Sequence, residues 1–108
     1  MVYIVELCNE DFCTFVGVFS TFDSAVDAAR KIHEYIKSKI NDIRSLGGVY
    51  RRAKVPEFRI NEKTSVLGRK YWKVELEKIG SFAYTWLEIS EVEIDHLDMK
   101  RISAVLGV

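Results

Sequence analysis

Apolar side chains dominate two short runs near the start of the chain, residues 2–8 and residues 12–19. Both runs are rich in β-branched and aromatic residues, and the turn-forming sequence Asn-Glu-Asp at positions 9–11 separates them. We therefore predict a β-hairpin. Because both of its faces are largely apolar, we expect the hairpin to lie centrally in a sheet, or to have an interface on one side, rather than to form an exposed edge.

A two-residue turn at positions 10 and 11 sets the expected register of this hairpin. It places Cys8 opposite Cys13 on the two strands. The further pairs follow by counting, with Val5 opposite Val16, Tyr3 opposite Val18, Ile4 opposite Gly17 and Val2 opposite Phe19.

Over residues 22–46 the apolar side chains recur at spacings of three and four, which predicts a helix with one apolar face. Ser20 or Thr21 is placed to cap the start of this helix, and the Gly47-Gly48 pair to end it. The apolar stripe consists of Phe22, Ala25, Ala29, Ile32, Ile36, Ile40, Ile43 and Leu46.

Such a helix is too long for the sheet that it covers. Residues 22–46 would span ~37 Å, whereas a six-residue strand spans ~20 Å. The apolar face of the C-terminal half therefore needs a cover, either residues 49–69 of the same chain or a second chain. We expect the protein-binding residues on this overhang, at Ile36, Ile40, Ile43 and Leu46.

Residues 49–69 are the least regular part of the chain. Residues 49–55 and 58–61 have the composition of short strands and are interrupted by Pro56, and residues 61–68 are predicted to form a loop.

Strand patterns return after this segment. Trp72, Val74 and Leu76 alternate with charged residues, and residues 84–89 form the expected partner strand. A change of parity predicts a bulge near Ser90. Asp98 is placed to cap a last short helix that uses Ile102, Val105 and Leu106.

The predicted fold class is α+β: a small antiparallel sheet of about four strands with one long amphipathic helix packed on one face. The order is strand, strand, long helix, an optional short strand, strand, strand, short helix. Residues 1–108 are expected to form a single domain, with residues 49–69 as a variable basic segment within it.

Two stretches of this sequence resemble short uncharacterised proteins of phages and bacteria. In these proteins a strand that ends in GVFS runs directly into a helix, as residues 17–25 (GVFSTFDSA) do here after the strand VYIV at residues 2–5. The strand WLEI at residues 86–89 extends the resemblance. The resemblance implies a small α+β fold and a viral or mobile-element source, and it implies no catalytic residues.

Composition narrows the class of protein. The 108 residues are 48% hydrophobic with no net charge, which argues against disorder, and no apolar run approaches the ~20 residues of a membrane span. The N-terminal sequence MVYIVE does not have the pattern of a signal peptide, so we expect a cytoplasmic protein, in the host cytoplasm if phage-encoded.

The neutral total conceals three blocks of charge. Residues 1–36 carry a net charge of −4, residues 37–73 of +8 and residues 74–108 of −4. Basic side chains beside aromatic ones suit phosphates and stacked bases, although a solvated surface that neutralises the acidic blocks explains the same pattern. The candidate anion-binding or nucleic-acid-binding residues are Lys37, Lys39, Arg44, Arg51, Arg52, Lys54, Arg59, Arg69, Lys70 and Trp72.

Few residues suggest covalent or metal chemistry. Cys8 and Cys13 are close enough in the predicted hairpin for a disulfide or a redox pair, but two reduced thiols are the favoured interpretation for a chain without a secretion signal. A zinc site from Cys8, Cys13, His33 and His96 is disfavoured because its spacing is loose. Acidic residues 88, 91, 93 and 95, near Glu75 and Glu77, are interpreted as a solvated surface rather than a cation site.

The expected function follows from these observations. No catalytic residues, cofactor or metal are predicted, and an enzyme is disfavoured. We expect a protein-binding module that associates with a protein partner or with itself as a homodimer, and that a phage or mobile element uses to engage or inhibit a host protein. Binding of nucleic acid or another anionic ligand through residues 37–73 is the alternative.

Overall fold

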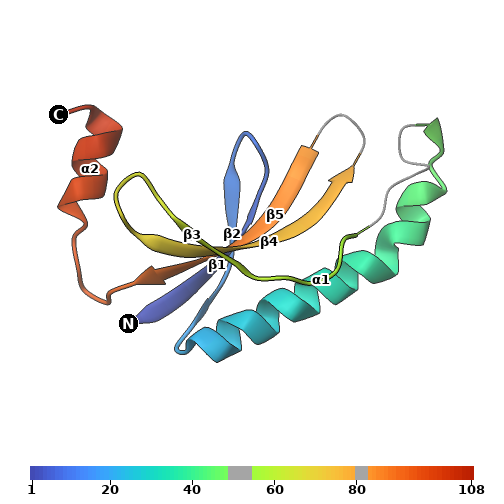
Figure 1. Cartoon of the computed structure of the whole chain (residues 1–108), viewed down its shortest axis with the longest axis horizontal. Helices are drawn as coiled ribbons and strands as arrows, with labels where there is room; N and C mark the ends of the chain where they lie inside the picture. The colour runs from blue at the N-terminus through green and yellow to red at the C-terminus, as the bar shows by residue number, and fades with distance from the viewer. Residues whose placement is uncertain (49–54, 80–82) are drawn as a thin grey trace.

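A computed structural model of the chain shows a five-stranded antiparallel sheet and two helices (Figure 1). It describes residues 1–48, 55–79 and 83–108, and at positions 41, 43, 77–79 and 83 it describes the backbone alone. The predicted α+β class is confirmed, whereas the prediction of about four strands was one short. The elements are β1 (Val2–Cys8), β2 (Cys13–Phe19), α1 (Phe22–Arg44), β3 (Asn61–Thr64), β4 (Lys70–Ile79), β5 (Ala83–Val92) and α2 (Met99–Leu106).

The strand order in the sheet is β2-β1-β5-β4-β3. The N-terminal hairpin is therefore central only through β1, which pairs with β2 on one side and β5 on the other. The expectation that the whole hairpin avoids the edge was wrong for β2. This strand lies at the edge of the sheet with most of its side chains exposed.

A bulge changes the predicted register of the hairpin. Cys8 pairs with Cys13 as predicted, but the ladder shifts between Val5 and Glu6, so that Val5 faces Gly17 instead of Val16. The remaining predicted pairs were wrong by one residue, because Tyr3 faces Phe19 and Ile4 faces Val18. Val16 is the extra residue that the bulge inserts into β2.

Three predictions for the second half of the chain also need correction. Residues 61–68 were expected to form a loop, but Asn61–Thr64 form the edge strand β3. The expected bulge near Ser90 is absent from the described ladder of β5 with β1, where Ser90 pairs regularly with Ile4. The irregularity lies instead between Glu75 and Lys78 of β4. The short strand expected over residues 58–61 was also wrong, since residues 55–60 are irregular and β3 begins at Asn61. Residues 49–54, predicted as part of another strand, are outside the described residues.

Helix α1 covers one face of the sheet (Figure 1). Thr21 caps it, since its Oγ1 accepts the backbone N–H of Ser24 at 3.1 Å. Gly47 and Gly48, both with positive φ, follow its end as predicted. The core between helix and sheet consists of Val5, Ala25, Ala29, Val74, Leu76, Leu87 and Ile89, with the half-buried rings of Tyr3, Phe22 and Trp72 packed against it.

Residues 55–60 run back beside the middle of α1 (Figure 1). The buried His33 ring donates from Nε2 to the Pro56 carbonyl at 2.6 Å and meets the Phe58 ring edge-on. Phe58 also receives the Arg30 guanidinium at 4.4 Å. Residues 49–69 or a second chain were expected to cover the helix, and residues 55–60 of the same chain supply part of that cover.

Candidate protein-binding surface

The sheet face opposite α1 is not covered by either helix (Figure 1). Strand side chains alternate between faces, so the residues between the core positions of each strand point to this side. We call it the uncovered face. Its residues are Ile4, Glu6 and Cys8 of β1, Cys13, Phe15 and Val18 of β2, Tyr71, Lys73 and Glu75 of β4, and Tyr84, Trp86 and Glu88 of β5.

The β2 end of the uncovered face is apolar and exposed. Phe15 is 61% and Val18 54% solvent-accessible, and Val18 faces Ile4 on β1. The side chains of β2 carry no charge, and natural sheets usually protect such an edge with Lys, Pro or a covering element. This part of the sheet is therefore suited to contact another polypeptide.

The β4–β5 end of the uncovered face is an aromatic and ionic cluster. Lys73 Nζ lies 4.5 Å from the ring centre of Trp86 and 4.8 Å from that of Tyr84, and 3.6 Å from Glu75 Oε1. The other carboxylate oxygen of Glu75 is buried and has no hydrogen-bond partner among the described residues.

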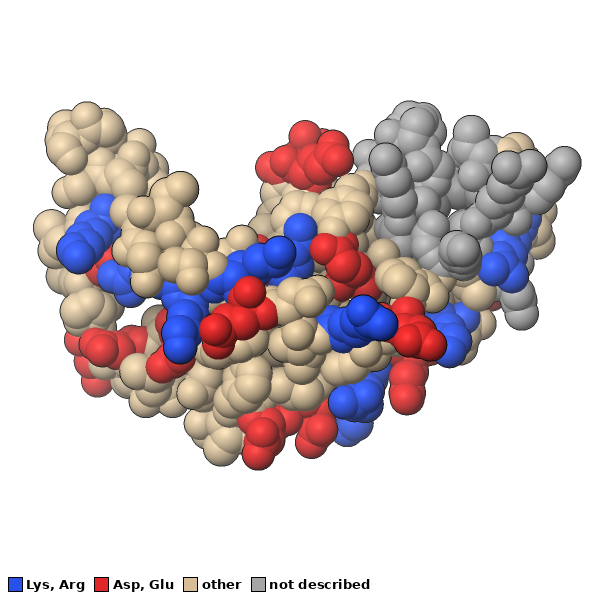
Figure 2. All heavy atoms as spheres, in the orientation of Figure 1, with Lys and Arg blue, Asp and Glu red and all other residues tan. Residues whose placement is uncertain are grey.

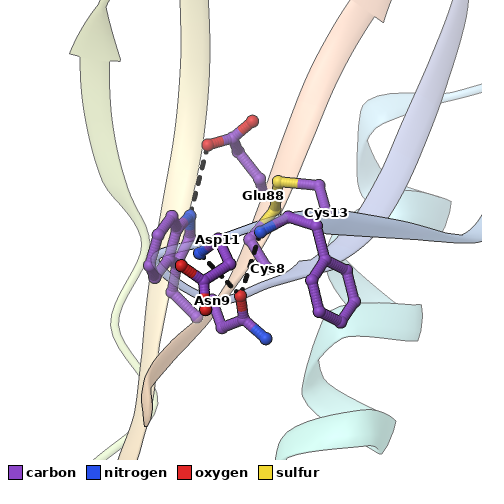
Figure 3. The surroundings of a disulfide bond; sticks show 7 residues. Cys8, Asn9, Asp11, Cys13 and Glu88 are labelled. Atoms are coloured by element: carbon purple, nitrogen blue, oxygen red, sulfur yellow. Dashed lines mark hydrogen bonds between the residues drawn. A yellow bond between two sulfur atoms is a disulfide. The ribbon is translucent and has the colours of Figure 1, made fainter. Parts of the chain in front are cut away.

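A disulfide joins the two strands of the hairpin at its turn (Figure 3). Cys8 is buried, Cys13 is exposed, and their Cα atoms are 4.0 Å apart. The turn between them is closed by Asn9, whose Oδ1 accepts the backbone N–H groups of Asp11 and Phe12. The favoured interpretation of two reduced thiols was therefore wrong for this structure, because the cross-strand register brings the two sulfurs into bonding distance.

Helix α2 stands apart from the sheet, beyond the end of β5 (Figure 1). Asp98 caps its start by accepting the Arg101 backbone N–H, and Gly107 ends it in the left-handed conformation. All eight of its residues are described and none is buried, with Val105 81% and Leu106 68% accessible. An isolated helix of this length is only marginally stable in water, and most helices are stabilised by packing of their apolar side. The apolar side of α2 has no such packing in this structure.

The charges of α2 and of the uncovered face are opposite. Lys100 and Arg101 are the charged residues within α2, whereas the uncovered face carries three acids, Glu6, Glu75 and Glu88, against one base, Lys73. Figure 2 shows a hollow between α2 and the tip of the β1–β2 hairpin. Arg101 and Glu88 line one small cavity on this side of the molecule. The Asp98 carboxylate holds α2 in this position through Arg69, at 2.9 Å.

Comparison of the chain with protein-family models, curated proteins and solved structures finds no match. None of the described helices is long and apolar enough to cross a membrane.

The predicted binding residues of α1 do not form one exposed surface. Ile40 is 8% accessible and Ile36 is packed against the core, so neither presents a free side chain to a partner. Leu46 is 70% accessible, and the side chain of Ile43 is outside the described part of the structure. The helix half that was expected to bind a partner is thus partly used within the chain.

The predicted anion-binding residues are dispersed. Lys37, Lys39 and Arg44 lie on the C-terminal half of α1, while Arg69 and Lys70 lie at the β3–β4 turn, at the opposite end in Figure 1. Lys39 lies over the Tyr35 ring, Arg69 pairs with Asp98, and Lys70 approaches Glu62 at 4.0 Å. Arg59 is exposed beside Glu57 and Glu75. Arg51, Arg52 and Lys54 are outside the described residues.

Trp72 is not positioned to stack on a base. Its ring lies 4.6 Å from Phe22 and 6.4 Å from Tyr3, on the core side of the sheet. The described basic residues and this ring therefore do not form one continuous patch.

The four residues of the considered zinc site are not brought together. His33 is part of α1 and donates to the Pro56 carbonyl. His96 lies 3.5 Å from Glu93, and the two cysteines lie at the hairpin turn. The apolar hairpin sequence predicted an interface on one side, and the uncharged β2 sequence CTFVGVF is the part of it that lies on the uncovered face, but the contributions of β4 and β5 to this face were not predicted.

Proposed function

We propose that this chain is a non-enzymatic protein-binding module whose binding surface is the uncovered face. The observation that carries the proposal is the exposed apolar end of that face, with Phe15 and Val18 on an uncharged edge strand. Exposed apolar surface next to aromatic groups is typical of protein interaction sites.

The occupant that fits this surface is a basic amphipathic helix. Its apolar side would cover Phe15, Val18 and Ile4, and its cations would approach the carboxylates of the same face. Direct packing of two uncovered faces is disfavoured, because each face carries three carboxylates and only one ammonium, Lys73, which already contacts Glu75 of its own chain.

Helix α2 of a second copy has these properties, so we propose that the chain self-associates by placing α2 of each copy on the uncovered face of the other. Such an exchange is isologous and closes as a dimer. It gives the exposed apolar side of α2 a packing surface and leaves the Arg69–Asp98 contact of each copy intact. A phage-encoded role in engaging or inhibiting a host protein is part of this proposal and is supported by the sequence resemblance alone.

Nucleic-acid binding is the competing function. The dispersal of the described cations over both ends of the molecule favours protein binding over a single phosphate-binding groove.

Light scattering coupled to size exclusion tests the proposal with three variants of the full chain. Phe15→Asp damages the face and Leu106→Asp damages the helix. Val66→Asp is the control, at a still more exposed apolar position on the β3–β4 turn. We expect a dimeric mass for wild type and Val66→Asp and a monomeric mass for the other two. Mixing Phe15→Asp with Leu106→Asp should restore a heterodimer, because one intact face then meets one intact helix.

Trp86 reports on the same contact. In a Trp72→Phe chain it is the sole tryptophan, and its emission should shift on dilution as the face becomes solvated. A monomeric wild type with unchanged Trp86 emission in Leu106→Asp would exclude α2 as the occupant. A monomeric wild type in which Leu106→Asp shifts the emission would show that α2 closes on its own sheet instead. A Phe15→Asp chain that remains dimeric would exclude the uncovered face.

A further inference from the structure

Three metal-binding atoms converge at the turn end of the uncovered face. Cys8 Sγ, Cys13 Sγ and a carboxylate oxygen of Glu88 all lie within 4.8 Å of one another (Figure 3). They come from the three neighbouring strands β1, β2 and β5, whose ladder fixes their positions. This cluster shares Glu88 with the surface proposed to bind α2, but its test measures metal binding and does not depend on self-association.

We propose that, once the disulfide is reduced, Cys8, Cys13 and Glu88 form a site for a thiophilic divalent cation such as Zn²⁺. Two thiolates and one carboxylate are ligands that Zn²⁺ accepts in tetrahedral sites, and three protein ligands leave the fourth position open. Because Cys13 is exposed, water or an external ligand can reach that position.

The oxidation state of the two cysteines decides whether the site can bind a cation. In the disulfide, neither sulfur is a thiolate, so the cation has no strong ligand. A dithiol reductant transfers two electrons and two protons to the disulfide, which yields two Cys thiols and the cyclic disulfide of the reductant. Zn²⁺ then replaces the two thiol protons, which are released to solvent.

The surroundings hold the ligands without the disulfide. Asn9 closes the turn between the cysteines with two hydrogen bonds, so the strands remain paired when the sulfurs separate to the ~3.8 Å that tetrahedral Zn–S bonds of ~2.3 Å require. Trp86 Nε1–H donates to Glu88 Oε1 at 3.2 Å and orients the carboxylate, which is the usual role of an outer hydrogen bond at a metal site.

Charge on the neighbouring strands favours a cation here. Glu88 lies directly opposite Glu6 on β1, and two like charges in facing positions destabilise a sheet. Lys73 lies opposite Glu88 on β4, but its ammonium approaches Glu75 and the Tyr84 and Trp86 rings. A cation bound by Glu88 would reduce the repulsion from Glu6.

Titration of the full chain with Co²⁺ and then Zn²⁺ tests the site. The protein is reduced with dithiothreitol, desalted under anaerobic conditions and compared with the oxidised protein. We expect the reduced protein to bind one Co²⁺ with the visible absorption of tetrahedral thiolate coordination, and Zn²⁺ to displace it. The oxidised protein and reduced Cys13→Ser should show no such absorption.

Glu88→Gln distinguishes the proposed three-ligand site from binding by two thiols alone. We expect it to weaken Zn²⁺ binding roughly tenfold or more, while Glu91→Gln, an exposed acid on the same strand, leaves binding unchanged. Binding that is equal in Glu88→Gln and wild type would overturn the assignment of Glu88. Absence of thiolate-to-cobalt absorption in the reduced wild type would overturn the site altogether.

Discussion

Lys73 Nζ lies 4.5 Å above the ring centre of Trp86, on the face of the sheet that neither helix covers. The same ammonium approaches the Tyr84 ring and the Glu75 carboxylate, and the Lys73 side chain is 21% accessible. A cation held between two aromatic rings and an acid loses much of its hydration, and this geometry makes the cation–π contact stronger than at an open surface. The cluster therefore stiffens the β4–β5 end of the uncovered face.

Replacing this cation should destabilise the fold measurably. Lys73→Met keeps the length of the side chain but removes both ring contacts and the ion pair, and we expect a loss of about 1–2 kcal/mol in the free energy of unfolding. Lys70→Met, which removes an exposed lysine 4.0 Å from Glu62, should change it by less than ~0.5 kcal/mol. Chemical denaturation measures both, and equal effects of the two substitutions would contradict a special role for Lys73.

The hydrogen bond of His33 should hold residues 55–60 against α1. His33→Leu keeps a side chain of similar size but removes the Nε2–H donor to the Pro56 carbonyl, which should cost about 1 kcal/mol because Pro56 is exposed and water can replace the donor. Limited proteolysis should cleave residues 55–60 faster in His33→Leu than in the wild type. His96→Leu, at an exposed position, serves as the control. If residues 55–60 keep their protection from cleavage in His33→Leu, another contact holds this segment against α1.

Reduction of the disulfide should lower stability without unfolding the chain. The bond closes a loop of only a few residues, so the loop-entropy model gives a contribution of about 2 kcal/mol. Denaturant unfolding of wild type with and without dithiothreitol measures it. Cys13→Ser should match the reduced wild type and should not respond to the reductant. Identical unfolding midpoints for oxidised and reduced wild type would contradict this prediction. Metal-free buffer is needed in every case.

Asp98 has two separable roles at α2. Asp98→Asn keeps a side-chain oxygen for the Arg101 backbone N–H but loses the ion pair with Arg69, whereas Asp98→Ala loses both. We expect Asp98→Ala to destabilise α2 by about 1 kcal/mol, seen as faster exchange of its amides, and Asp98→Asn to leave this exchange nearly unchanged. Global stability should change little in either variant because α2 has no buried residue in the described structure. Equal exchange rates in the two variants would show that the cap does not stabilise the helix.

Several elements were predictable because their signals are local. The strand at residues 2–8, the start of α1 at Phe22 and the Asp98 cap follow from side-chain periodicity and capping chemistry within a few residues. The register beyond Cys8 was not predictable, because the bulge at Val16 depends on how β2 bends against β1. β3 escaped prediction because its charged sequence NEKT becomes a strand through its pairing with β4.

The candidate binding sites also combine features that local sequence predicts with features that only the folded chain decides. The apolar stripe of α1 predicted a face that needs a cover, but only the folded chain decides that Ile40 is buried and Leu46 is not. The basic residues of the segment 37–73 lie close together in the sequence. They lie apart in the structure because the chain between them passes from α1 into the sheet.

By itself, the sequence determined the α+β class, the order of the elements and the presence of two amphipathic helices, since these depend on short-range periodicity. The tertiary structure decided which sheet face stays uncovered, that Cys8 and Cys13 are bonded and that Glu88 lies beside them. These relationships join residues up to 80 positions apart through strand register, and register is set by the packing of the whole sheet against α1.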